Sequence, residues 1–422
     1  MDGRLYPADG LDSAAVRHMV EAYRLPRVAR TCRCKPTPSL PAILGIPGYA
    51  GLGPMSNTQR GLVGSKMLCL IVPLLMSGPT AGATEGECSA SGEYSFVCGP
   101  RNAEDLVRVP GTKWIIASGM DPGAAIYLID SEDKTWQALY PTGAPRAAQD
   151  MDTFGACPGA PDPKAFVSHG LNLRPGAKGH STLYVVAHGG REAIEVFDVD
   201  ASGTTPVLTW TGCVPTPDGM EANSVASTAA GALLATIPLH TGIDIGEAIA
   251  GNKTGGVYAW SPGDAGFILV EGTELPYANG IEVSADGKEF YVASSGLLTV
   301  SAYANTNPSR LLRSSEPLAF VPDNLHWGND GELMTAGLNL ASAECGEVIR
   351  TVEFSLQAFA SCPRPFSVWA VDPQTMAGRL VAEGPANPNF SNITMALPVD
   401  DTLWIGTFGG DRVAYRSLVP SE

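Results

Sequence analysis

The chain has 422 residues, of which 27 are basic and 43 are acidic, and its formal net charge at pH 7 is −16. A protein this acidic repels the phosphates of nucleic acids and anionic membrane surfaces. We therefore expect no nucleic-acid partner, and the charge suits a soluble, exported protein.

Residues 55–83 have the three parts of a secretory signal peptide. Arg60 and Lys66 form the basic region, MLCLIVPLLM at 67–76 is the apolar region, and Ala81-Gly82-Ala83 matches a cleavage site. Ten apolar residues are too few to span a bilayer as a helix. No stable membrane insertion is therefore expected after cleavage, and the mature protein is predicted to be secreted or periplasmic.

A signal peptide begins its protein, whereas this one follows 54 other residues. We therefore predict that translation starts at Met55 or Met67, and that residues 1–54 are a mis-called or disordered N-terminal extension. The alternative for the apolar run is a buried helix, which Pro73 and the flanking Gly and Ser disfavour.

Residues 84–422 are predicted to form the folded domain. Loss of residues 1–83 removes nine basic and four acidic side chains, which leaves a net charge of −21. Six of the nine cysteines remain, and an even number in an exported chain predicts disulfides. Proximity in the sequence favours Cys88–Cys98, Cys345–Cys362 and Cys157–Cys213, although six cysteines allow 15 pairings.

Short apolar runs separated by turn residues fill this domain, among them AAIYLID, TLYVVAH, AIEVFDVD, KEFYVAS and TLWIGTF. Such runs predict strands. They group into six units whose starts lie 45 to 68 residues apart, which predicts an all-β, six-bladed β-propeller. The last unit lacks a fourth strand, so we expect a strand near 94–98 to complete it. The one helical candidate, 347–361, lies between two cysteines and is expected to cover one end of the channel.

Five polar residues recur at the start of the first strand in four of these units. They are Glu104, Asn223, Asn279, Asp323 and Asn324, and Asn392 opens the sixth unit. The first strands of a propeller line its central channel, so these residues should converge. Two carboxylates and three amide oxygens at one point are ligands for a hard cation, and they predict a calcium site. Taken singly, each has another interpretation, because Asn279-Gly280 and Asp323-Asn324 are also typical of turns.

His169 opens the remaining unit, and His188 ends the strand that follows it. Antiparallel pairing should place these two ends side by side at the same rim. We predict that one imidazole activates water and that the other orients it or relays its proton. The alternative is a merely structural pair of histidines. His326 should point to the same side and line the site.

Other catalytic patterns are absent from the sequence. It has no G-x-S-x-G elbow, no H-E-x-x-H, no P-loop and no G-x-G-x-x-G that opens a helix. If the chain is an enzyme, the metal is therefore expected to be central to its chemistry.

The chain resembles the paraoxonase family of calcium-dependent lactonases and arylesterases, within a wider group of gluconolactonase- and strictosidine synthase-like propellers. The motifs that carry the resemblance are GPRNAEDLVRV, VSHGLNL, LYVVAHGGREAIEVFDVD, ANSVAS, ANGIEVSADGKEFYVA and PDNLHW. The resemblance implies a six-bladed propeller and a catalytic calcium ion at Glu104, Asn223, Asn279, Asp323 and Asn324. It also implies a catalytic dyad of His169 and His188.

The resemblance implies a second, structural calcium ion as well. Its ligands would include Asp105, the main-chain carbonyl of Leu171 and an Asp at a position that is Ser224 here. Loss of a carboxylate weakens a cation site, so the second ion is the weaker prediction. The family's disulfide between the two chain ends has no counterpart, because no cysteine follows Cys362.

The predicted function is hydrolysis of a small-molecule lactone or aryl ester, with calcium polarising the carbonyl and a histidine activating water. Two alternatives remain at this point. A gluconolactonase-type sugar lactonase would use a metal and a carboxylate without the histidine pair. A non-catalytic propeller would bind a ligand or protein partner at its rim. The sequence leaves the substrate and the oligomeric state open.

Overall fold

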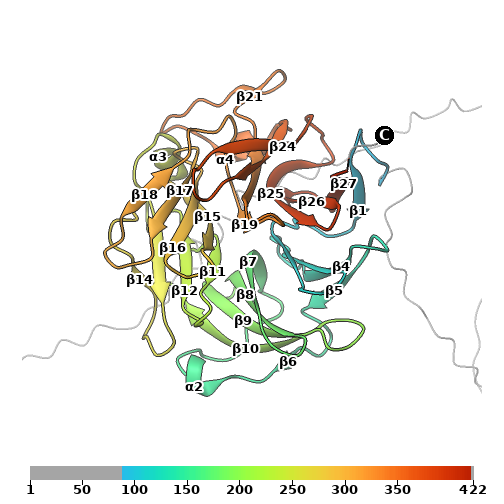
Figure 1. Cartoon of the computed structure of the whole chain (residues 1–422), viewed down its shortest axis with the longest axis vertical. Helices are drawn as coiled ribbons and strands as arrows, with labels where there is room; N and C mark the ends of the chain where they lie inside the picture. Colours follow the sequence, from blue (N-terminus) through green and yellow to red (C-terminus); the bar gives the residue numbers. More distant parts are fainter. Residues whose placement is uncertain (1–87, 420–422) are drawn as a thin grey trace, which may run out of the picture. The chain divides into compact units, whose positions relative to one another are not determined.

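Residues 88–419 of the chain are described by the computed structural model, and they form six antiparallel β-sheets arranged as the blades of a ring (Figure 1). The predicted six-bladed β-propeller is therefore confirmed. The predicted signal peptide (55–83) and extension (1–54) lie outside the described residues. Within 88–419, none of the helices has the length and apolar character needed to cross a bilayer.

The first three blades follow the chain in order. Blade 1 comprises β2 (Leu106–Arg108), β3 (Trp114–Ala117), β4 (Ile126–Asp130) and β5 (Thr135–Tyr140). Blade 2 comprises β7 (Val167–Pro175), β8 (His180–His188), β9 (Ala193–Asp200) and β10 (Val207–Pro215), with β6 (Arg146–Ala147) added parallel to β10. Blade 3 comprises β11 (Val225–Ser227), β12 (Leu233–Ile237), β13 (Gly256–Trp260) and β14 (Ile268–Leu269).

The last three blades complete the ring. Blade 4 comprises β15 (Ala278–Val283), β16 (Glu289–Ser294), β17 (Thr299–Ala304) and β18 (Leu311–Ser314). Blade 5 comprises β19 (Leu325–Trp327), β20 (Leu333–Leu338), β23 (Phe366–Val371) and β24 (Gly378–Gly384). Blade 6 comprises β25 (Ser391–Val399), β26 (Thr402–Gly409), β27 (Arg412–Ser417) and β1 (Ser95–Cys98).

The strand predicted near 94–98 closes the ring as expected. It is β1, which pairs antiparallel with β27 from Ser95 opposite Tyr415 to Cys98 opposite Arg412. The two ends of the propeller thus share one sheet, and the last blade gains its fourth strand from the start of the domain. Hydrogen bonds of this sheet therefore hold together segments about 320 residues apart, by the separation of these paired positions.

Strands in the middle of each blade are buried along most of their length, because each blade is packed between two others. All five residues of β4 (IYLID) and of β12 (LLATI) are buried. Four of the six residues of the outer strand β5, by contrast, are exposed. A continuous apolar run therefore marks a middle strand here, and polar residues mark the outer edge of the blade.

All three disulfides expected from sequence proximity are present: Cys88–Cys98, Cys157–Cys213 and Cys345–Cys362. The first ties the start of the described chain to β1, and the third closes the insertion within blade 5. Three disulfides in one domain are typical of proteins that fold in an oxidising compartment.

The helix predicted over 347–361 is only partly correct. The structure has a small hairpin of β21 (Ala341–Ser342) and β22 (Gly346–Glu347), then turns, and a helix only at α4 (Leu356–Ser361). Ser355 caps α4 through a hydrogen bond from the Ala358 amide at 3.2 Å. The short helices α2 (Met151–Phe154) and α3 (Ile245–Ile249) lie in two other loops.

Two glycines let the inner strands approach one another closely. A Cβ on Gly170 would overlap the Asn223 carbonyl of the next blade, and a Cβ on Gly280 would overlap the backbone nitrogen of Leu325. These glycines directly follow His169 and Asn279. The Asn279-Gly280 pair consequently lies inside β15 and is not a turn.

We predict that Gly280→Ala lowers the free energy of unfolding by about 1–3 kcal/mol, because the added methyl group must displace backbone. Gly266→Ala is the matched control: its added Cβ meets no atom within 4 Å, and the expected change is within about 0.5 kcal/mol. Urea unfolding of the two variants measures the difference. Equal stability of the two variants would contradict close packing of the inner strands.

Candidate active site

The predicted ligands gather at one end of the central channel. Glu104, Asn223 and Asp323 lie just before β2, β11 and β19, while Asn279 lies in β15. These four line a single pocket together with His169 of β7. Asn324, the fifth predicted ligand, donates from Nδ2 to Glu104 Oε1 at 2.6 Å. The ring topology thus brings together residues up to 220 positions apart.

β-bulges turn two of these side chains toward the channel. The pairing of β7 with β8 shifts register between Ser168 and Leu171, where His169 lies. The pairing of β15 with β16 shifts between Ala278 and Ile281, where Asn279 lies. A bulge adds an unpaired residue and re-aims its side chain, which explains how residues within strands reach the end of the channel.

Four oxygen atoms of the predicted ligands are buried without a hydrogen-bond partner: Glu104 Oε2, Asn223 Oδ1, Asn279 Oδ1 and Asn324 Oδ1. The amide nitrogen of Asn279 donates to Ser295 Oγ at 3.0 Å, and that of Asn324 donates to Glu104. In both residues the side-chain amide nitrogen has a hydrogen-bond partner and the amide oxygen has none.

Burial of polar atoms without hydrogen-bond partners lowers the stability of the fold. Each unsatisfied buried polar group costs about 1–3 kcal/mol, so four cost together about 4–12 kcal/mol. This is comparable with the whole stability of a typical domain, about 5–15 kcal/mol. A cation bound among them would satisfy all four, since hard oxygen atoms are the ligands that calcium prefers.

The raised pKa values of two carboxyl groups at the site also favour a bound cation. Burial, then the charges of Asp105 and Asp323, raises the pKa of Glu104 well above its usual value. Burial, together with the charge of Asp105, raises the pKa of Asp323 to about 7, although a hydrogen bond with Asn279 opposes this. Buried carboxylates that repel one another are stabilised by a bound cation. The residues present therefore fit a calcium ion.

Most of the proposed metal ligands are amide oxygens. Within residues 88–419, no three His, Cys, Asp or Glu side chains form a metal-binding group. The predicted set has only two carboxylates, and the remaining three ligands are asparagines.

His169 and His188 are in contact as predicted. His169 Nδ1 lies 3.0 Å from His188 Nε2, and His169 Nε2 lies 3.7 Å from Glu104 Oε1. Burial, and to a lesser degree the neighbouring His188, lowers the pKa of His169 well below its usual value. Burial also acts to lower the pKa of His188, but the charges of Glu192 and Glu221 outweigh it and raise that pKa.

His326 lies elsewhere than expected. It lines a separate pocket at a different part of the channel, with Glu282 and Arg108, and not the pocket of the predicted ligands. Its Nε2 is 2.6 Å from Asp105 Oδ1 and its Nδ1 is 3.3 Å from Glu282 Oε1. These two carboxylates outweigh the effect of burial and raise the pKa of His326 to about 10.

The residues of the implied second calcium site do not fit a cation. Asp105 Oδ1 accepts from the Leu106 amide at 2.8 Å and contacts His326, and Asp105 Oδ2 accepts from the Leu171 amide at 2.7 Å. Both carboxylate oxygens thus accept hydrogen bonds within the protein, and His326, whose pKa is raised, can supply the positive charge beside them. Ser224 donates its amide to Thr236 Oγ1 at 3.0 Å. The structure offers ligands for one ion in this channel.

The walls of the candidate site are largely apolar. The wall comes from α3, the insertion that follows β20, strand β26 and neighbouring loops, and its apolar residues are Met120, Ile245, Ile249, Leu298, Val321, Leu340, Val348, Phe354, Leu356, Phe359 and Phe408. Tyr277 adds a phenol ring to this wall. Arg350 also lines the pocket, but its guanidinium donates to the carbonyls of Ile249 and Gly296. The cavity therefore has a polar floor and an apolar wall.

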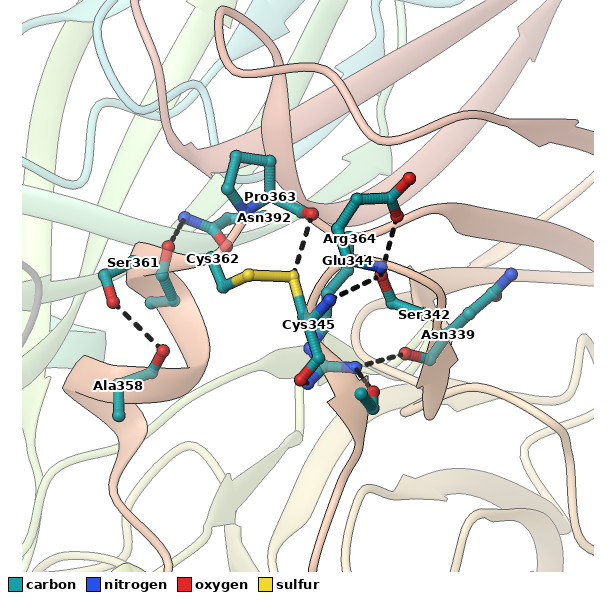
Figure 2. The surroundings of a disulfide bond; sticks show 12 residues. Asn339, Ser342, Glu344, Cys345, Ala358, Ser361, Cys362, Pro363, Arg364 and Asn392 are labelled. Atoms are coloured by element: carbon teal, nitrogen blue, oxygen red, sulfur yellow. Dashed lines mark hydrogen bonds between the residues drawn. A yellow bond between two sulfur atoms is a disulfide. The ribbon is translucent and has the colours of Figure 1, made fainter.

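A disulfide and hydrogen bonds hold the insertion in place, and Figure 2 shows this disulfide with its surroundings. The Cys345–Cys362 disulfide joins its two ends, and Arg364 donates to the carbonyls of Leu340 and Gly346 at 3.1 and 3.0 Å. Asn392, which opens the sixth unit, donates to the carbonyl of Ala360 in α4 at 3.1 Å. Asn392 thus braces the insertion, and it is not among the residues that line the pocket of the predicted ligands.

Three residues of the site have no signal in the sequence. Glu192 contacts His188, Ser295 orients the Asn279 amide, and Thr394 donates to the Glu104 carbonyl at 2.6 Å. Each acts from a different strand or loop than its partner, at a spacing that no motif describes.

Comparison with known proteins gives no family assignment: no protein-family model and no curated protein matches the chain. Solved structures do match. A gluconolactonase from Xanthomonas campestris is 15% identical, with 77% of this chain and 89% of that chain covered and a TM-score of 0.46. A luciferin-regenerating enzyme is 14% identical (76% and 92% covered, TM-score 0.45). The calcium-binding protein regucalcin from Agrobacterium tumefaciens is 11% identical (75% and 90% covered, TM-score 0.44).

All three matches are low in identity and lie below a TM-score of 0.5. At such identities and TM-scores they say nothing of the substrate of this chain. The strand topology described above defines it as a six-bladed β-propeller.

Proposed function

We propose that this protein is an exported, calcium-dependent hydrolase of lactones or aryl esters. The observation that carries the proposal is the set of four buried, partnerless oxygen atoms beside a hydrogen-bonded histidine pair. The ion would be held by Glu104, Asn223, Asn279, Asp323 and Asn324. The three disulfides support export, because such bonds persist in oxidising compartments.

The metal and the histidines have separate roles in this proposal. When bound, calcium polarises a carbonyl and stabilises a developing oxyanion. His169 acts as general base for the attacking water, since its Nε2 faces the ligand Glu104 and its Nδ1 contacts His188. His188 receives charge from His169, away from the cation.

The pocket favours an apolar substrate over a sugar lactone. A polyhydroxylated ring needs many hydrogen-bonding partners, and the wall of aliphatic and phenyl side chains supplies few. The histidine pair also has no role in the gluconolactonase-type alternative. A non-catalytic propeller would gain nothing from a hydrogen-bonded base beside the metal ligands.

The experiment is a substrate panel assayed with calcium and after removal of metal by a chelator. For lactones with alkyl side chains, we expect each added methylene to raise kcat/KM about 3- to 4-fold until the pocket is full, because its burial contributes about 0.8 kcal/mol. Gluconolactone should be a poorer substrate, and chelation should remove activity that added calcium restores.

Three outcomes would contradict the proposal in different ways. A preference for gluconolactone would favour the sugar lactonase, and full activity in demetallated protein would remove the role of calcium. Hydrolysis of no substrate by calcium-loaded protein would favour the non-catalytic propeller.

A further inference from the structure

Glu192 forms a third member of the histidine chain. It lies in the turn between β8 and β9, four residues after His188, and its Oε2 is 2.5 Å from His188 Nδ1. Its side chain is only 17% exposed. Its carbonyl accepts hydrogen bonds from the Thr216 amide at 3.1 Å and from Thr216 Oγ1 at 3.3 Å. The carboxylate is therefore anchored by its own backbone, independently of the imidazole.

The contact decides where the histidine protons lie. A carboxylate can only accept, so His188 Nδ1 must carry the hydrogen that points to Glu192. In neutral His188 the lone pair is then on Nε2, which lies 3.0 Å from His169 Nδ1. His169 Nδ1 must donate to it, which leaves the lone pair of His169 on Nε2. That atom faces Glu104 and the pocket.

We infer that Glu192 is a positioning residue that fixes the tautomers of both histidines and acts as the counterion of His188 during hydrolysis. This inference rests on the proposed function for its catalytic consequence. For neutral His188 the tautomers follow from the geometry alone, and no metal is needed to fix them.

The proton balance of the step closes. As water adds to the carbonyl carbon, one O–H bond breaks and its proton goes to His169 Nε2, while a C–O bond forms. The proton on His169 Nδ1 passes to His188 Nε2. The positive charge then rests on His188, against Glu192, and the electrons of the carbonyl π bond rest on the former carbonyl oxygen. When these electrons re-form the C=O bond, the C–O bond to the leaving group breaks, and the proton returns by the reverse route to the leaving oxygen.

The second imidazole and the carboxylate determine where the positive charge formed during hydrolysis lies. His169 is 2% exposed and lies beside the proposed ligands, where a positive charge is costly without a counterion. His188 is also buried, at 6% exposed, but it faces Glu192 directly. Glu221 is the other carboxylate whose charge acts on His188. Glu104, the carboxylate beside His169, is a proposed ligand of the cation, so the chain moves the charge to an imidazole that faces a carboxylate outside the ligand set.

The test uses Glu192→Ala and Glu192→Gln in the full chain. Loss of a group that orients a functional residue typically costs about 10- to 100-fold, so we expect this loss in kcat for Glu192→Ala, with KM nearly unchanged. Glu192→Gln keeps an acceptor oxygen but loses the charge, so its kcat should be intermediate. Glu289→Ala is the control, because Glu289 is a similarly shielded carboxylate paired with Arg313 in blade 4; its kcat should be unchanged.

A spectroscopic readout separates positioning from a merely structural role and needs no activity. Long-range proton–nitrogen correlation spectra of protein labelled with ¹⁵N-histidine, metal-free, should show His188 protonated at Nδ1, with assignment from His188→Gln. Glu192→Ala should lose this preference, and Glu192→Gln should keep it. A wild-type His188 protonated at Nε2, or full kcat in Glu192→Ala of an active enzyme, would overturn the inference. Absence of hydrolase activity in the wild type would instead overturn the proposed function.

Discussion

The His169→Gln variant should hydrolyse its best substrate about 10²–10⁴-fold more slowly than the unmodified protein, the range expected for loss of a general base. Its affinity for calcium should stay nearly unchanged, because His169 contacts the ligand Glu104 at 3.7 Å and is not itself one of the five proposed ligands. Activity assays and calcium titration calorimetry measure the two quantities separately.

His180→Gln is the matched control for this variant. His180 is a half-exposed histidine in β8, paired with Asp198 at 3.1 Å at the other end of the strand. Its removal should leave both kcat and calcium affinity unchanged. Full activity in His169→Gln would discard the histidine mechanism and leave the metal site standing, which would favour the gluconolactonase-type alternative.

Calcium should raise the melting temperature of the unmodified protein by several degrees. A ligand at about 1,000 times its Kd stabilises the folded state by about 4 kcal/mol. Asn223→Ala, which removes one of the partnerless oxygens, should lose most of this rise. Thermal unfolding with excess calcium and with a chelator measures it.

Asp323→Asn should separate the effect of charge from that of shape. Because the folded pKa of Asp323 is raised from 3.8 to about 7, its ionisation costs folding stability as the pH rises through that range. At pH 8 in chelator, the neutral variant should therefore melt higher than the unmodified protein. In calcium it should melt lower, because the ion loses a charged ligand.

Asn172→Ala provides the control for both variants. Asn172 is a buried asparagine of β7 whose Oδ1 accepts from Ser227 Oγ at 2.7 Å, outside the candidate site. Its loss should lower the melting temperature equally with and without calcium. Identical melting temperatures of calcium-loaded and demetallated wild-type protein would contradict the calcium assignment itself.

The sequence by itself determined the architecture and the position of the candidate ligands. Apolar runs between turns predict strands because each blade is buried on both faces, and the spacing of the runs predicts six blades. Once six blades are expected, ring closure alone makes the starts of the inner strands meet. Glu104 and Asn324 could therefore be placed together, although they lie 220 residues apart. The disulfides followed from proximity along the chain.

Only the tertiary structure decided what surrounds those residues. The sequence places His326 two residues after Asn324 on the same side of the strand, but two residues of rise carry it about 7 Å further along the channel, where it contacts Asp105 and lines a different pocket. The sequence makes 347–361 a helical candidate, yet only Leu356–Ser361 is helical. A disulfide and hydrogen bonds from Arg364 and Asn392 hold the insertion in place.

Glu192 shows most clearly why the contacts around the site could not be predicted from the sequence. Periodicity records which face of a strand is buried, but it does not record where a turn places a side chain relative to an imidazole. The 2.5 Å contact with His188 depends on the path of the β8–β9 turn and on its anchor at Thr216. Contacts of this kind are set by several segments at once, so they appear only when the blades are assembled.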